Sequence, residues 1–154
     1  MRCYLVRHGI AEPGPEDRAR RLTPEGRAEV EGAAHALRAR GAQVAEIRHS
    51  GLTRARETAE ILGRSLAPPH GVHAATGLAP EDDPEVLQAE LELATEPLMV
   101  VGHLPHLARL VAVLVGAALA EPIRLTPGTV VVLRRGRDGW APETVVGPHA
   151  EAPS

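Results

Sequence analysis

The sequence is poor in aromatic and sulfur-containing side chains. Its 154 residues include one tryptophan, one tyrosine, one cysteine and no phenylalanine, and the net charge is −3. A single cysteine excludes an internal disulfide and is usual in a reducing compartment. Proteins that bind nucleic acid generally need aromatic stacking platforms or an excess of positive charge. We therefore expect neither a structural disulfide nor a nucleic-acid partner.

Long apolar runs are also missing. No stretch approaches the roughly 20 apolar residues that a membrane-spanning helix needs, and no signal-peptide layout follows Met1. Hydrophobic residues at 44% and charged residues at 24% are ordinary globular values. We expect a soluble cytoplasmic protein without a membrane partner. It should have a single domain over residues 1–146 and a frayed C-terminal tail over residues 147–154.

Lysine and asparagine are absent, so all 17 basic side chains are arginine. A GC-rich genome would explain this composition, because it favours alanine, arginine, glycine and proline codons. An individual arginine is therefore uninformative unless a motif places it.

Predicted strands alternate with predicted helices along the chain. Apolar runs predict strands at 3–6, 45–49, 72–74, 98–101, 129–133 and 143–146. Helical periodicity and capping residues predict helices at 24–40, around 55–62, from Pro84 and after Pro105, with Gly41 ending the first. This alternation is typical of an α/β fold, here a three-layer α/β/α sandwich with a mostly parallel central sheet. The closing hairpin would add one antiparallel strand.

Basic residues follow three of the predicted strands. Arg7-His8 follows the first strand, Arg54 falls in the first turn of the helix after the second, and His103 follows the run at 98–101. The carboxyl ends of strands in an open α/β sheet form the ligand-binding crevice, so these side chains should converge. Two arginines and two histidines repel one another unless an anion lies between them. A phosphoryl group best fits the planar guanidinium fork.

The residue types suit phosphoryl transfer through a covalent intermediate. A neutral His8 can attack phosphorus with one ring nitrogen while the other donates to a carbonyl that fixes the tautomer. Gly9 lacks a Cβ and would let the phosphoryl group approach the backbone. Arg54 lies where the unpaired N–H groups of a helix attract anions, whereas Arg56 is expected on the surface.

The same segments resemble the motifs of the histidine phosphatase superfamily. These are Leu-Val-Arg-His-Gly at 5–9, Leu-Thr-x-x-Gly at 22–26, Ser-x-x-x-Arg-Ala-x-x-Thr-Ala at 50–59 and Val-Gly-His-x-Pro at 101–105. The resemblance implies that His8 is transiently phosphorylated, that Arg7, Arg54 and His103 form the catalytic pocket, and that neither metal nor cofactor is required. None of the other histidines shows zinc-site spacing.

The chain is most similar to the small SixA-type phosphohistidine phosphatases. Arg20-x-Leu22-Thr23 with Asp17 upstream is similar to their loop, and the resemblance implies that Gly9 and Arg20 also contact the substrate. Residues 78–97 leave room for about one helix, so no cap subdomain is expected. An open pocket would accept a phosphorylated side chain on another protein, such as a histidine phosphotransfer domain.

The general acid is the one departure from the family pattern. Many relatives carry a glutamate after the third strand, where this chain has Pro80. Glu81 and Asp82 are the candidates instead, and Asp83 before a proline predicts a helix cap. Two alternatives to a phosphohistidine phosphatase stay open: a phosphatase of small phosphomonoesters with the same mechanism, and a non-catalytic phosphate-binding module.

Overall fold

The computed structural model describes residues 1–116 and 123–148. Its strands are β1 (Arg2–Arg7), β2 (Glu46–His49), β3 (Val72–Ala74), β4 (Leu98–Gly102), β5 (Val130–Gly136) and β6 (Gly139–Val146). Its helices are α1 (Pro24–Ala39), α2 (Thr53–Leu66), α3 (Pro84–Leu93), α4 (His106–Val115) and the short 3-10 helix η1 (Asp17–Ala19).

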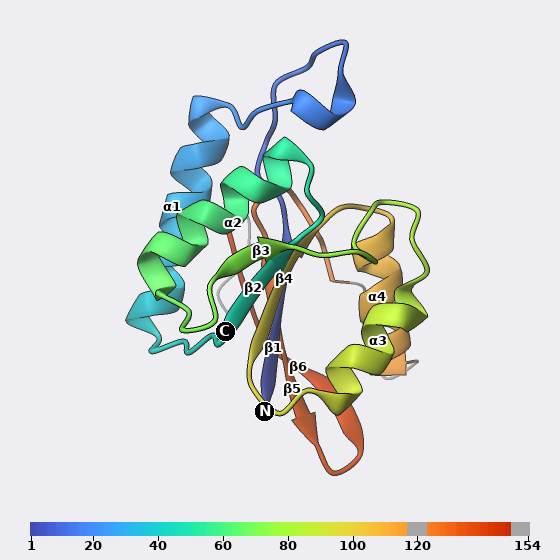
Figure 1. Ribbon diagram of the computed structural model, residues 1–154. Helices are drawn as coiled ribbons and strands as arrows, with labels where there is room; N and C mark the ends of the chain where they lie inside the picture. The colour runs from blue at the N-terminus through green and yellow to red at the C-terminus, as the bar shows by residue number, and fades with distance from the viewer. Residues whose placement is uncertain (117–122, 149–154) are drawn as a thin grey trace.

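The described strands form one six-stranded sheet in the order β3-β2-β4-β1-β5-β6 (Figure 1). Strands β3, β2, β4 and β1 pair in parallel, β5 is antiparallel to β1, and β6 is antiparallel to β5. The predicted mostly parallel sheet with one antiparallel strand is therefore confirmed. All residues between β3 and β4 are described, and α3 is the single helix among them. This connection therefore contains no cap subdomain.

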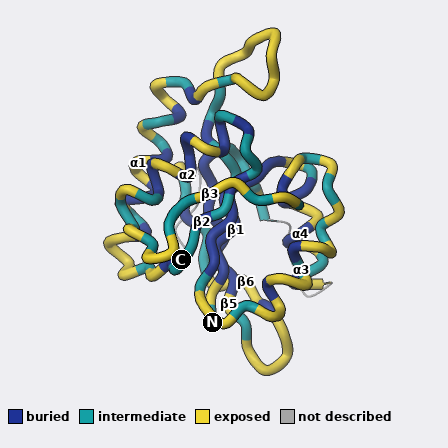
Figure 2. The backbone as a smooth tube through the Cα atoms, viewed as in Figure 1, coloured by how far each residue is buried: buried dark blue, intermediate teal, exposed yellow. Residues whose placement is uncertain are grey.

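Helices cover both faces of the sheet, with α1 and α2 on one side and α3 and α4 on the other (Figure 1). Alternate residues of β1 explain the two layers, because Tyr4 and Val6 join the core cluster under α1 and α2, whereas Cys3 and Leu5 join the one under α3 and α4. Strand β4 is buried along its whole length and β1 is buried between its two end residues, as Figure 2 shows. The three-layer α/β/α sandwich is confirmed.

Capping residues set the helix ends where the sequence predicts them. The Thr23 hydroxyl accepts the Gly26 N–H at 2.9 Å at the start of α1, and Asp83 accepts the Glu85 N–H at 2.9 Å at the start of α3. After α1, Gly41 adopts a φ of +74°, and the Ala42 N–H returns to the Leu37 carbonyl at 3.0 Å.

The final hairpin is longer than the sequence predicts. Strand β6 begins at Gly139 rather than residue 143, and β5 continues to Gly136. Pro142 argues against a strand in the sequence, because proline lacks the backbone N–H that donates to a neighbouring strand. The sheet tolerates Pro142 for two reasons: β6 is an edge strand, and the pairing of β6 with β5 is already irregular between Val132 and Leu133. The expected tail begins at residue 147, and its residues 149–154 lie outside the described ranges. Within those ranges, no helix combines the length and apolarity needed to cross a bilayer.

Candidate active site

The ends of β1, β2 and β4 meet at one edge of the sheet. Arg7 pairs with Gly102 at the last register position of β1 and β4, and His49 at the end of β2 pairs with Val101. The following residues therefore come together, and the rings of His8 and His103 lie 4.9 Å apart between centroids at an interplanar angle of 45°.

His8 is held with a defined tautomer. Its backbone N–H donates to the Gly102 carbonyl at 3.1 Å, and its Nδ1 lies 2.7 Å from the Gly9 carbonyl oxygen, which can only accept. Nδ1 therefore carries the proton and Nε2 keeps a lone pair. Burial lowers the pKa of His8 to about 4, and the charges of Arg54, Arg7 and Arg20 act in the same direction. The ring is neutral at pH 7, as a nucleophile requires.

His103 is more deeply enclosed, with 2% of its surface exposed. Its Nε2 lies 2.6 Å from Ser50 Oγ, whereas its Nδ1 is buried without a hydrogen-bond partner among the described residues. Burial lowers the pKa of His103 to about 3, and the charges of His8 and Arg54 contribute. Both imidazoles of the site are thus neutral at pH 7.

Two arginines flank the imidazoles from different elements. Arg54, 6% exposed, donates from Nη1 to the Asp17 backbone carbonyl at 2.8 Å and from Nη2 to the Asp17 carboxylate at 3.3 Å. Arg7 donates from Nη1 to the Leu125 carbonyl at 2.8 Å, while its Nε is buried without a partner among the described residues. Burial lowers the Arg7 pKa from its ordinary value. Arg56, by contrast, lies at the surface and pairs with Glu60.

The loop between β1 and α1 brings a third arginine near His8. Arg20 donates to the Asp17 carboxylate at 3.1 Å and to the Glu12 carbonyl at 2.8 Å. Asp17 thus bridges Arg20 and Arg54, and the hydrogen bond from Arg20 followed by the Arg54 charge lowers its pKa. Sequence reasoning noted Asp17 only as an acidic neighbour, since its partner Arg54 is 37 residues away.

Residues of α2 fix the loop that carries His8. The Thr58 hydroxyl accepts the Gly9 N–H at 3.1 Å and donates to the Arg54 carbonyl at 2.8 Å. The buried Glu57 accepts the Leu22 N–H at 2.9 Å and pairs with Arg27 at 2.6 Å. These contacts join the segment 50–59 to the segment 22–26, although the sequence alone does not show that the two segments touch.

The two candidate acids occupy different environments. Glu81 is 79% exposed at its side chain and lies 3.5 Å from Arg109. Asp82 accepts the Ala79 N–H at 2.9 Å and lines a cavity of about 560 Å³ that also contains Ser50 and Val86. Asp82 therefore lines the same cavity as Ser50, the residue that contacts His103, whereas Glu81 is directed to solvent. Asp83 caps α3, as predicted.

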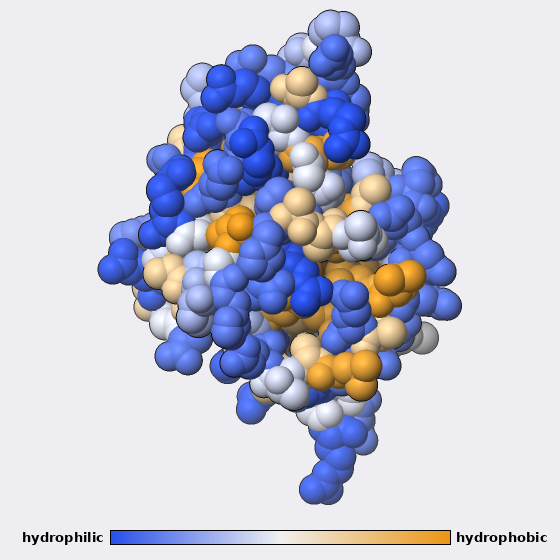
Figure 3. All heavy atoms as spheres, viewed as in Figure 1, coloured by the Kyte–Doolittle hydropathy of each residue, from blue (hydrophilic) through white to orange (hydrophobic). Residues whose placement is uncertain are grey.

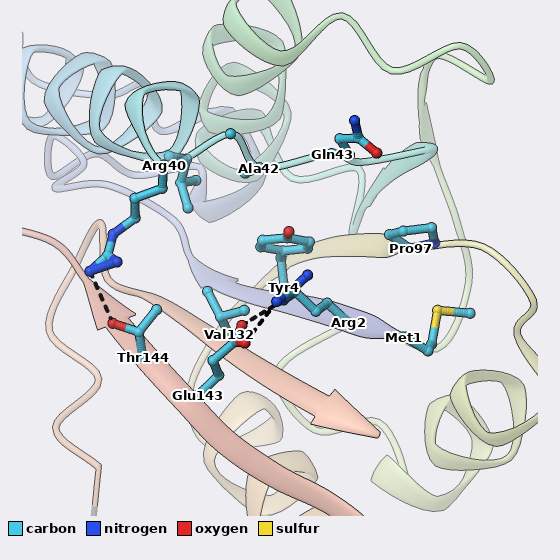
Figure 4. A pocket seen from close by; sticks show the side chains of 12 residues that line it. Met1, Arg2, Tyr4, Arg40, Ala42, Gln43, Pro97, Val132, Glu143 and Thr144 are labelled. Carbon is cyan, nitrogen blue, oxygen red and sulfur yellow. Dashed lines mark hydrogen bonds and ion pairs between the residues drawn. The ribbon is translucent and has the colours of Figure 1, made fainter. Parts of the chain in front are cut away.

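A larger cavity of about 670 Å³ lies at the opposite end of β1 (Figure 4). Its charged groups are already paired: Arg2 binds Glu143 at 2.6 and 2.9 Å, and Arg40 binds the Thr144 hydroxyl at 3.3 Å. None of the residues that the motifs place lines this cavity. Across the described residues, no cluster of three or more histidine, cysteine or acidic side chains is placed to hold a metal ion.

Comparisons with known proteins bear on the family and the fold. A sequence model described as the histidine phosphatase superfamily (branch 1) matches residues 3–78. An uncharacterized protein of Picosynechococcus sp. is 32% identical over 143 residues, which cover 88% of this chain and 86% of that protein.

Solved structures show the same fold over nearly the whole chain. The protein histidine phosphatase SixA complexed with tungstate matches with a TM-score of 0.87 and 24% identity, covering 96% of this chain and 97% of that one. A putative phosphohistidine phosphatase SixA from Nakamurella multipartitia matches with a TM-score of 0.79 and 25% identity, covering 98% and 96%. The chain therefore belongs to the histidine phosphatase superfamily, has the fold of its SixA-type members, and is on this basis a phosphatase.

Proposed function

We propose that this protein is a metal-independent phosphatase that removes the phosphoryl group from phosphohistidine on a phosphotransfer protein, through a phosphorylated His8. One observation carries the proposal. The 2.7 Å contact of His8 Nδ1 with the Gly9 carbonyl leaves Nε2 with a lone pair, on a partly buried neutral ring beside a second histidine and cationic groups. That is the arrangement an attacking imidazole requires.

Two displacement steps give a balanced reaction. In the first, His8 Nε2 bonds to phosphorus, the bond to the substrate nitrogen breaks, and that nitrogen keeps the electron pair and takes a proton. In the second, water attacks phosphorus and gives one proton to the solvent, the bond to Nε2 breaks with its electron pair returning to the ring, and inorganic phosphate leaves. Arg7, Arg54 and Arg20 neutralise the phosphoryl oxygens, and the Gly9 carbonyl stabilises the Nδ1–H of the phosphorylated ring.

The surroundings of the site favour a substrate carried by a protein. Only α3 lies between β3 and β4, so this connection adds no helical insertion over the site. Val86, on the rim of the neighbouring cavity, is 54% exposed, and Leu104, next to His103, is 37% exposed. Figure 3 shows apolar atoms gathered on the α3 side of one face. Exposed apolar groups beside a polar pocket suit contact with a protein surface.

A substrate comparison tests the proposal. Purified protein is given a phosphorylated histidine phosphotransfer domain and, separately, a panel of small phosphomonoesters that includes p-nitrophenyl phosphate. We expect the larger kcat/KM on the phosphorylated domain, full activity in EDTA and no activity for His8→Ala. Turnover retained by His8→Ala would refute the mechanism, and a preference for the small esters would refute the substrate.

Asp82 favours a second candidate, a phosphatase of small phosphomonoesters. An alkyl oxygen leaves poorly without a proton donor, whereas the imidazole of phosphohistidine is readily protonated. Asp82 lines the same cavity as Ser50 and is the carboxyl group proposed to supply that proton. Asp82→Asn should therefore slow ester hydrolysis selectively if esters are the substrates. A non-catalytic phosphate-binding module would bind orthovanadate but hydrolyse none of the compounds.

A further inference from the structure

We propose that the Asp17 carboxylate is an internal competitor of the phosphoryl group: it binds Arg54 and Arg20, an incoming phosphoryl group displaces it, and free inorganic phosphate therefore occupies the pocket only weakly. The proposal rests on the proposed function, because inorganic phosphate is the product of that reaction. Asp17 lies in η1, in the loop between β1 and α1 (Figure 1). The sequence motifs place Asp17 in this loop but assign it no contact.

Two arginines converge on the carboxylate of Asp17. Arg54 donates to it from Nη2 at 3.3 Å, and Arg20 donates to it from Nη1 at 3.1 Å. A position between two guanidinium groups is the one that an anion prefers, and phosphoryl oxygens fit the same planar N–H groups as carboxylate oxygens do. A phosphoryl group held by both arginines would therefore take the place that the carboxylate now has.

Asp17 binds Arg54 through a second group, its backbone carbonyl, which accepts from Nη1 at 2.8 Å. This carbonyl belongs to the turn of η1, where it also accepts the Arg20 N–H at 3.4 Å. The carboxylate contact with Nη2 is longer, and the Asp17 side chain is 64% exposed. The carboxylate can thus turn into water, where its charge is solvated, while the carbonyl keeps Arg54 in place.

The charge of Asp17 acts on the whole pocket. The hydrogen bond from Arg20 and the charge of Arg54 lower the pKa of Asp17, so its carboxylate is ionised at pH 7. Burial lowers the pKa of His103 to about 3, and the negative charge of Asp17 acts in the opposite direction. One carboxylate therefore interacts with two arginines and an imidazole, the groups that the proposed function assigns to the phosphoryl oxygens.

The expected consequence is weak inhibition by the product. Any phosphoryl group that enters must replace the interaction of Asp17 with the two arginines, which weakens its binding. A phosphorylated protein can offset this loss through contacts outside the pocket, such as the exposed Leu104 beside His103. Inorganic phosphate has no such contacts, so the carboxylate returns to the arginines and the phosphate leaves.

Asp17→Asn tests the competition, because it removes the charge and keeps the backbone carbonyl and the size of the side chain. Glu16→Gln is the matched control, since it removes the same charge one residue away, from an exposed side chain with no recorded contact. Circular dichroism establishes that both variants are folded. Calorimetric titration at pH 7 and physiological ionic strength measures their affinities for inorganic phosphate and orthovanadate.

We expect Asp17→Asn to bind both anions about five-fold more tightly than the wild type, the effect of removing one partly exposed charge pair, and Glu16→Gln to differ by less than about two-fold. The inhibition constant of inorganic phosphate should fall with its dissociation constant. Equal or weaker anion binding by Asp17→Asn would overturn the proposal, because it would make Asp17 a residue that only orients the arginines. An equal gain in Glu16→Gln would also overturn it.

A crystal structure of the wild type with orthovanadate gives a second readout. We expect the anion to contact Arg54 and Arg20, the Asp17 carboxylate to have left Arg54 Nη2, and the Asp17 carbonyl to remain on Nη1. A carboxylate still bound to Nη2 beside the anion would contradict the displacement. Failure of the proposed function looks different: a wild type that binds orthovanadate but hydrolyses no phosphate compound would refute the enzyme, while the anion affinities would still decide what Asp17 does.

Discussion

Burial sets the protonation state of the two histidines in this site, because it lowers the pKa of each. His8 donates from Nδ1 to the Gly9 carbonyl, which leaves Nε2 as the nucleophile. The surrounding positive charges oppose protonation of the ring. The motifs predicted which four side chains converge, because each follows a strand end or begins a helix. They did not predict the partners Ser50, Glu57 and Asp17, since hydrogen bonds across 35 to 53 residues leave no local pattern.

The pH dependence of catalysis follows from the depressed pKa of His8. A protonated Nε2 cannot attack phosphorus, and burial lowers the His8 pKa to about 4, so the neutral form persists well below the ordinary histidine value of 6.5. We expect kcat/KM, which reports the free protein, to stay level from neutral pH down to about 5 and to fall in stronger acid. A loss of kcat/KM centred near pH 6.5 would show that the ring is not held neutral.

Glu57 should be important for stability. Burial alone would raise its pKa, but the Leu22 N–H and the charges of Arg27 and Arg21 outweigh this effect and lower the pKa. Glu57→Gln removes a buried charge from these partners and should lower the free energy of unfolding by about 2 kcal/mol. Glu60→Gln, an exposed glutamate on the same helix, should change it by less than about 0.5 kcal/mol. Equal urea midpoints for the two variants would contradict this role.

At the scale of elements, close contact between α1 and the β1 loop positions His8. A Cβ on Gly26 would overlap the Ile10 carbonyl oxygen, which is backbone and cannot rotate away. The sequence motif placed this glycine, but only the structure gives the reason. In the hairpin of β5 and β6 the sequence was misleading. Pro142 argued against a strand, but β6 pairs with β5 through an irregular register that accommodates the proline.

Two glycines of α1 therefore predict opposite effects. Gly26→Ala forces the loop after His8 away from the helix and should lower both the free energy of unfolding, by about 2 kcal/mol, and kcat/KM. Gly32→Ala meets no atom within 4 Å and should raise the free energy of unfolding by about 0.5 to 1 kcal/mol, since alanine favours helix. Urea titration and steady-state kinetics measure both. A stabilised, fully active Gly26→Ala would disprove the contact.

For the whole molecule, we propose that residues 1–146 fold as one cooperative unit. The sheet separates two core clusters, but β1 and β5 contribute side chains to both, so neither cluster can lose its packing alone. Trp140, the single tryptophan, is buried in the cluster under α3 and α4. Its fluorescence and the far-ultraviolet circular dichroism of all helices should therefore lose their native signals at the same urea concentration. Separate midpoints would indicate two independently folding parts.

The central claim, a phosphorylated His8, is tested most directly by trapping the intermediate. The protein is mixed with a 32P-labelled substrate, quenched within one turnover in alkali, digested and analysed by mass spectrometry. We predict one label per chain, attached to the Nε2 of His8, stable in alkali and lost in acid, and absent from His8→Ala. A label on another residue, or rapid turnover with no labelled protein at any quench time, would contradict it.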